Sequence, residues 1–99
     1  MGDEVASRQT AEDAAQALAL NALAYLLDDP ARTRRFLSVT GVDGVDLPAR
    51  LGDPAFLGCV LDFVLEDEVS LLALAGAAGV RAERIGRLRL RLPGALPHG

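Results

Sequence analysis

Few side chains in this 99-residue sequence could carry out covalent or acid–base chemistry. The chain has one cysteine, Cys59, one histidine, His98, and no lysine, which excludes a lysine Schiff base. His98 follows Pro97 at the irregular C-terminus, where nothing positions it as a base for Cys59 or for a serine. We therefore expect no catalytic residues and no enzymatic activity.

The best candidates for metal ligands are two carboxylates, Asp62 and Glu66. On a helix they lie one turn apart and could both contact a hard cation. That spacing is also common on solvent-facing helices, and the sequence has neither a calcium-binding loop nor a glycine-rich phosphate loop. We expect no metal and no other cofactor. Only a pocket that also contained Tyr25 would favour an enzyme.

Arginines near the C-terminus form the main candidate binding patch. Arg84, Arg87 and Arg91 share one side of a predicted helix, and guanidinium groups bind phosphate and carboxylate through paired hydrogen bonds. These three residues are predicted to contact a partner or an anion. The alternative is an ordinary amphipathic helix, whose arginines face solvent and partly neutralise acidic residues of the same chain. The sequence allows both.

Charge is distributed unevenly along the chain, whose net charge is −4. Residues 41–68 contain one arginine and seven acidic residues, whereas residues 69–99 contain five arginines and one glutamate. Because the whole chain is acidic and no aromatic residue accompanies these arginines, nucleic-acid binding is disfavoured. A DNA-reading helix-turn-helix is disfavoured too, because Asp62 would be the only charged residue of the recognition helix at residues 54–65.

Aspartate, proline and glycine mark the predicted ends of helices in a chain that is rich in helix-forming residues. The pairs Asp29-Pro30 and Asp53-Pro54 predict helix starts, because aspartate is a favoured N-cap and proline is tolerated in the first turn. Gly41 is predicted to end a helix in the left-handed conformation. The predicted helices cover residues 11–27, 30–40, a short piece from 46, 54–65, a segment ending at 79, and 82–92. The sequence allows either a break or a continuous helix at residues 65–69.

The last of these elements has an ambiguous pattern. Arginine and leucine alternate over residues 87–92, as in a β-strand, but Ile85, Leu88 and Leu92 also share one face of a helix. No second strand is predicted that could pair with this segment, and isolated strands are unstable. The helix is therefore the favoured interpretation.

Together these elements predict an all-α protein, a compact bundle of about five short helices joined by Asp-Pro and glycine turns. We expect a flexible acidic leader at residues 1–9, a single helical domain at 10–93 and a flexible tail at 94–99. The acidic N-terminus is unlike a secretory signal, and the uncharged stretches are too short to span a membrane. A lone cysteine, expected to be a small buried residue, fits a cytoplasmic location.

The first predicted helix, residues 11–27, is apolar on nearly every side. Leu18 and Ala22 mark one face, and Leu20 and Leu23 mark nearly the opposite one. Such a helix is either the central element of a fold or an oligomer contact. Asn21 is expected to be a buried residue that bonds to backbone or sets the helix register.

Three segments carry a family resemblance: ALNALAYL at residues 19–26, RFLSVTG at 35–41 and DPAFLGCVLDFVL at 53–65. In order and spacing they resemble a family of small bacterial helical proteins known as domain of unknown function 3572, over about residues 17–94. Tyr25 stands where the family pattern has tryptophan, and the arginine-rich end is more basic than usual. The resemblance implies a helical fold and supplies no activity, substrate or site residue.

The favoured interpretation of function is a non-catalytic protein–protein interaction or regulatory module. It rests on the missing catalytic groups and on the surplus apolar surface of the first helix, which a protein partner or a second copy of the chain could cover. The alternative is nucleic-acid or phosphate-ligand binding through the arginine-rich C-terminal helix.

Overall fold

The longest element, helix α1 (Gly2–Leu27), runs through the whole molecule. The computed structural model describes residues 2–94, with side chains from Thr10 onward. The predicted start at Ala11 is wrong, because no proline interrupts residues 2–10 and acidic residues near a helix N-terminus favour its dipole. The flexibility of residues 1–9 stays a prediction. Of the predicted tail, residues 95–99 lie outside the described part.

Helix α2 (Pro30–Thr40) has the predicted bounds and caps. The Asp29 carboxylate accepts a hydrogen bond of 3.0 Å from the backbone N–H of Arg32. Gly41 ends the helix with φ of +73°, in the left-handed region that only glycine adopts at low cost. A short 3₁₀ turn, η1 (Gly44–Asp46), and helix α3 (Leu47–Arg50) follow, where a short helical piece is predicted.

Two further helices are separated by a true break. Helix α4 (Pro54–Leu65) is capped by Asp53, and helix α5 (Glu68–Ala78) begins after the extended residue Asp67. The hydroxyl of Ser70 donates a hydrogen bond of 2.6 Å to the Asp67 carboxylate. This local contact stabilises the start of α5, which resolves the choice that the sequence left open at residues 65–69.

The final element, α6 (Ala82–Arg89), is a helix, as predicted. It ends earlier than the predicted residue 92, and residues 90–93 form turns. Ile85, Leu88 and Leu92 are buried, so the apolar face continues past the helix end. The residues described thus form an all-α protein of six α-helices and one 3₁₀ turn, close to the predicted five or so helices.

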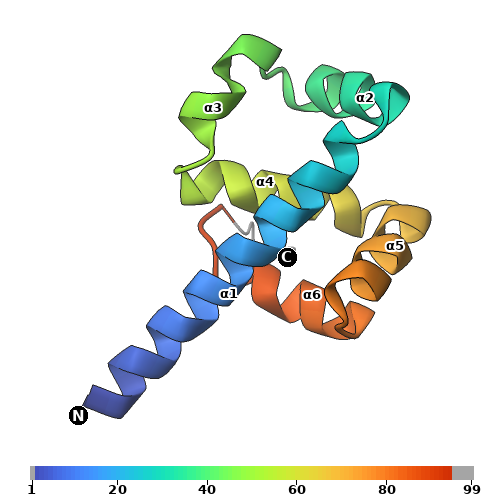
Figure 1. Cartoon of the computed structure of the whole chain (residues 1–99). Coiled ribbons are helices and arrows are strands. Elements are labelled where there is room, and N and C mark those ends of the chain that lie inside the picture. Colours follow the sequence, from blue (N-terminus) through green and yellow to red (C-terminus); the bar gives the residue numbers. More distant parts are fainter. Residues whose placement is uncertain (1, 95–99) are drawn as a thin grey trace, which may run out of the picture.

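Helix α1 is the central element. It contacts α2, α4, α5 and α6, most extensively α4, which lies across it (Figure 1). Ala15, Ala19 and Ala22 are fully buried on one side of α1, and such small residues let neighbouring helices approach closely. The N-terminal part of α1 extends beyond the other helices (Figure 1). The sequence allowed either a central element or an oligomer contact for this helix, and the structure shows it as the central element of the fold.

Aromatic residues fill the core beside α2. The ring of Phe36 is fully buried and meets Phe56 and Phe63 edge to face, with centroids 6.1 and 5.3 Å apart. Leucine, valine and isoleucine side chains from α1, α4, α5 and α6 complete a single core. Among the described residues no helix combines the length and apolarity needed to cross a membrane.

Candidate interaction surfaces

The predicted arginine patch lies on the solvent side of α6 and just beyond it. Arg84 and Arg87 are exposed and one turn apart on the helix. Arg91 is also exposed, but it belongs to the turn that follows α6 and not to the helix. The structure therefore separates the predicted trio into a helical pair and a turn residue. None of the described residues forms a hydrogen bond or ion pair with these three guanidinium groups.

A fourth arginine, Arg89, is buried, and the sequence analysis did not single it out. Its Nε and Nη2 donate hydrogen bonds of 2.6 and 2.9 Å to the two carboxylate oxygens of Asp62. Its Nη1 donates to the backbone carbonyl oxygens of Leu92 and Pro93, each at 3.1 Å. Chiefly through the hydrogen bonds to Asp62, the pKa of Arg89 is raised above its already high ordinary value. Arg89 is thus a structural cation that fastens the C-terminal turn to α4.

A signal for this role exists in the sequence. Arg89 stands four residues after Ile85 and three before Leu92, which places it on the apolar face of α6. Gly58 on α4 faces it, and a Cβ at that position would lie 2.8 Å from Nη1 of Arg89. The sequence left open whether the C-terminal arginines contact a partner or acidic residues of the same chain. Arg89 contacts Asp62 of the acidic segment, residues 41–68, so the second alternative holds for this arginine alone.

The two carboxylates considered as metal ligands, Asp62 and Glu66, have different surroundings. Asp62 binds Arg89, and Glu66 is exposed at the end of α4. Within residues 10–94, no three histidine, cysteine or carboxylate side chains come close enough to hold a metal ion. The side chain of Tyr25 lies elsewhere, beneath the guanidinium of Arg32, whose carbon is 3.9 Å from the ring centroid. Of the three residues that would have favoured an enzyme, Asp62 and Tyr25 thus interact with different arginines, and Glu66 is exposed.

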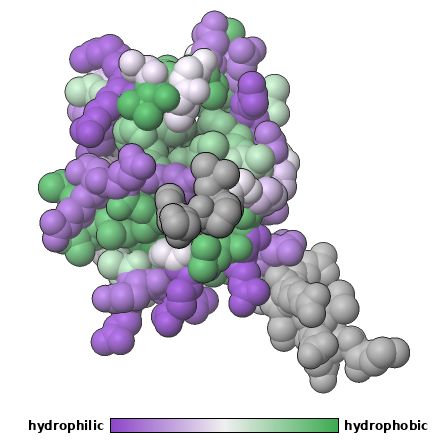
Figure 2. All heavy atoms as spheres, turned by 180° about the vertical axis from the view of Figure 1, so that it is seen from behind, coloured by the Kyte–Doolittle hydropathy of each residue, from purple (hydrophilic) through white to green (hydrophobic). Residues whose placement is uncertain are grey.

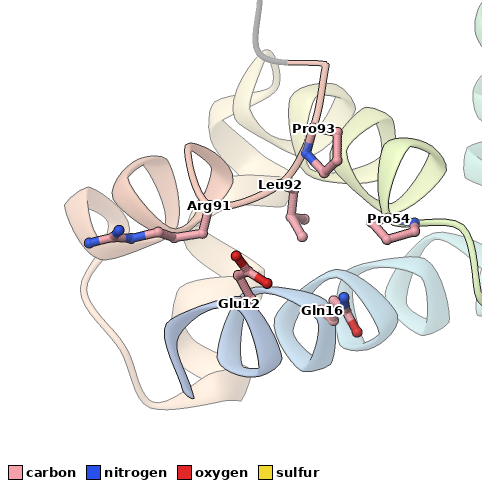
Figure 3. A pocket seen from close by; sticks show the side chains of 6 residues that line it. All are labelled: Glu12, Gln16, Pro54, Arg91, Leu92 and Pro93. Carbon is pink, nitrogen blue, oxygen red and sulfur yellow. The ribbon is translucent and has the colours of Figure 1, made fainter. Parts of the chain in front are cut away.

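One cleft borders the arginine patch. It has a volume of about 350 Å³ and lies between α1, the start of α4 and the C-terminal turn (Figure 3). The lining residues are Glu12, Gln16, Pro54, Arg91, Leu92 and Pro93. Leu92 and the Glu12 carboxylate point toward the cleft, whereas the Arg91 guanidinium points away from it (Figure 3). This lining mixes polar and apolar side chains and contains no cysteine, serine or lysine that could act as a nucleophile.

Two predictions about buried residues are wrong. Cys59 is exposed on α4, because the buried face of this helix is formed by its neighbours Phe56, Val60 and Val64. Asn21 is exposed on α1, on the side that no other helix covers. Asn21 therefore needs no buried hydrogen bond, and Cys59 is a solvent-accessible thiol.

Apolar side chains also reach the surface, most clearly on α5. Val69 and Leu72 are 72% and 58% exposed, and Ala73 and Gly76 on the same side are exposed as well. Figure 2 shows hydrophobic side chains at the surface in the half of the molecule that contains α5, with hydrophilic side chains above and below them. We call Val69, Leu72, Ala73 and Gly76 the α5 face.

Fold and surfaces together define a small all-helical protein with exposed apolar and basic areas and no metal-binding cluster among the described residues. Residues 12–95 match the family model described as "Protein of unknown function (DUF3572)". The chain belongs to this family, as the resemblance implied. No curated protein and no solved structure matches the chain.

Proposed function

We propose that this protein is a non-catalytic protein–protein interaction or regulatory module. The observation that carries the proposal is the α5 face, where Val69 and Leu72 expose most of their surface to water. Burying apolar area of this kind gains free energy in proportion to the area removed from water, at about 25 cal/mol per Å². Exposed apolar areas on small folded proteins mark contact surfaces more often than isolated exposed residues do.

The absence of enzymatic activity is part of the same proposal. It is supported by Tyr25 and Asp62, which interact with two different arginines, Arg32 and Arg89. We also propose a cytoplasmic location. An exposed, unpaired thiol such as Cys59 is compatible with a reducing compartment, where it is not driven into a disulfide.

Affinity capture from the native host tests the proposal. The wild-type chain is compared with Leu72→Glu, which places a charge in the α5 face, and with Val45→Glu as a matched control. Val45 is 80% exposed on η1, so both substitutions put a carboxylate at an exposed apolar position. We expect a bound protein, either another chain or a second copy of this one, that Val45→Glu retains and Leu72→Glu loses. Equal capture by all three chains, or none, would contradict the proposal.

A second candidate function rests on the exposed arginines. Arg84, Arg87 and Arg91 have no partner among the described residues and could bind phosphate groups or an acidic ligand. The net charge of −4 opposes a general affinity for nucleic acid. Retention on mixed nucleic acid and on immobilised phosphate, measured against salt, separates the two candidates. Loss of retention in Arg84→Ala/Arg87→Ala at low salt would support this second function, and no retention of the wild-type chain would reject it.

A further inference from the structure

The α5 face is uncovered along the full length of its helix. Val69, Leu72, Ala73 and Gly76 follow the spacing of one helical face, and the opposite face is buried through Leu74 and other residues. No charged residue occurs between Glu68 and Arg81. Helix α5 is therefore apolar on both sides: one side packs in the core, and the other, the α5 face, is exposed to water.

The glycine in this face has no role inside the chain. Gly76 lies in the last turn of α5, and a Cβ built there would meet nothing within 4 Å. Glycine at a helical position is less stable than alanine. By contrast, Gly58 is required by the close approach of Arg89. A missing side chain at the surface is useful where a second backbone or a large side chain comes close.

The α5 face is complementary to an antiparallel copy of itself at Val69 and Gly76. If two α5 helices lie antiparallel about a two-fold axis centred between Leu72 and Ala73, Val69 of one copy faces Gly76 of the other. The two Leu72 side chains then meet each other on one side of the contact, and the two Ala73 side chains meet on the other side. At the centre line of the face, Val69 of each copy thus meets the smallest residue, Gly76. In a parallel arrangement the two valines would face each other and so would the two glycines.

Charges at the two ends of α5 favour the same arrangement. Glu66 and Glu68 are exposed at its start, and Arg81 is exposed just after its end. In an antiparallel pair, the acidic start of each helix lies beside the basic end of the other. A parallel pair would place like charges together, which costs free energy and disfavours that geometry.

We propose that the α5 face binds a second copy of this chain, with the two α5 helices antiparallel about a two-fold axis. Val69 packs against Gly76 of the other copy, Leu72 packs against its Leu72, and Glu66 and Glu68 lie near its Arg81. The contact is isologous, so it closes at two copies. This inference rests on the proposed interaction function and names the partner for the α5 face.

The size of the surface predicts a weak dimer. Helix α5 has 11 residues and is therefore about 16 Å long. One helix of this length covers much less than the roughly 800 Å² per partner of a standard stable interface. The association should therefore depend on concentration over a range of about 10 µM to 1 mM.

Sedimentation equilibrium of the full chain across this range tests the proposal. We expect the wild-type chain and Val45→Glu to associate and Leu72→Glu to stay monomeric, with all three equally helical by circular dichroism. A wild-type chain that is monomeric at every concentration overturns the dimer. The proposed function then stands if host capture still finds another protein that Leu72→Glu loses, so the two failures are distinguishable.

Gly76→Ala provides a variant that cannot fail simply by unfolding. The added methyl group meets open space in the single chain and improves helix propensity, so the folded monomer should be more stable than wild type. In the dimer the same group collides with Val69 of the other copy, and the dissociation constant should rise by about tenfold or more. Unchanged association of Gly76→Ala would contradict the antiparallel packing.

Charge reversal tests the orientation. Glu68→Arg alone and Arg81→Glu alone should each weaken self-association, because like charges then face each other across the two-fold axis. Mixing the two variants should restore association, since the arginine introduced in one chain then meets the glutamate introduced in the other. Mixed variants that stay monomeric, or single variants that associate like wild type, would overturn the proposed orientation.

Discussion

Asp62 and Arg89, 27 residues apart in the chain, form a two-point ion pair that joins α4 to the end of α6. The side chain of Arg89 is 5% exposed and that of Asp62 is 50% exposed. Arg89 is therefore almost completely shielded from water, so hydrogen bonds within the protein must replace its hydration. Water still reaches the carboxylate of Asp62. The carbonyl oxygens of Leu92 and Pro93 complete the surroundings of the guanidinium.

Asp62→Ala should lower the free energy of unfolding by about 2 kcal/mol, because a buried guanidinium loses two charge-assisted hydrogen bonds. The loss should stay below the roughly 3–5 kcal/mol of a fully buried pair, since water can partly replace the half-exposed carboxylate. Urea unfolding of dilute protein measures the change. Glu66→Ala, an exposed carboxylate one turn further along, serves as the control and should unfold like wild type.

Gly58→Ala should destabilise the fold by about 1–3 kcal/mol. Its Cβ would lie 2.8 Å from both Nη1 of Arg89 and the carbonyl oxygen of Pro93, so the buried guanidinium or the C-terminal turn must move. Gly86→Ala on α6 is the matched control, because a Cβ there meets nothing within 4 Å. The control should stabilise the fold by roughly 0.5–1 kcal/mol through helix propensity. Thermal unfolding in which both variants shift in the same direction would contradict this account.

Acid should weaken the start of α5. The hydrogen bond from the Ser70 hydroxyl lowers the pKa of Asp67 below its ordinary value of 3.8, despite a smaller opposing effect of desolvation. A lowered pKa in the folded state stabilises the fold above pH 3.8, and this stabilisation is lost as the pH falls through the folded-state pKa.

Ser70→Ala checks this pH dependence. At neutral pH the variant should unfold at lower urea than wild type, because the carboxylate of Asp67 loses its main hydrogen bond. The difference in midpoint should shrink as the pH falls below about 4, where the carboxyl group is protonated in the unfolded chain. A difference that stays constant down to about pH 2 would indicate that the hydroxyl acts by packing alone.

Phe36→Ala should lower the free energy of unfolding by about 3–5 kcal/mol. Phe36 is fully buried and contacts the rings of Phe56 and Phe63, so its removal leaves a cavity in the middle of the core. Val39→Ala on the same helix should change stability by less than about 0.5 kcal/mol, because Val39 is exposed. Chemical denaturation of the two variants in parallel tests the position of the core beneath α2.

Local interactions account for the elements that could be predicted from the sequence. The caps at Asp29-Pro30 and at Gly41 act within a few residues, so their residue types are enough to locate the ends of α2. The choice of helix over strand for α6 could also be made from the sequence, because no second strand is predicted and a single strand is unstable.

Which side of each helix is buried was decided by the tertiary structure. Arg89 lies on the same side of α6 as Ile85 and Leu92, but only the packing of α6 against α4 places the carboxylate of Asp62 beside its guanidinium. Cys59 and Asn21 were expected inside the protein and lie outside it. An apolar helix such as α1 or α4 offers more than one face that could be buried, and only the packing of the other helices selects among them.

The sequence by itself therefore determined the all-α class, the helix ends marked by Asp-Pro pairs and glycine, and the family. The tertiary structure decided that Asp62 is a structural partner of Arg89 and that α5 keeps an uncovered apolar face. It also left Arg84 and Arg87 exposed, with no hydrogen-bond or ion-pair partner among the described residues. The physical reason is the distance along the chain over which each kind of interaction acts. Capping and helix propensity act over one or two turns, whereas burial and ion pairing depend on segments that only folding brings together.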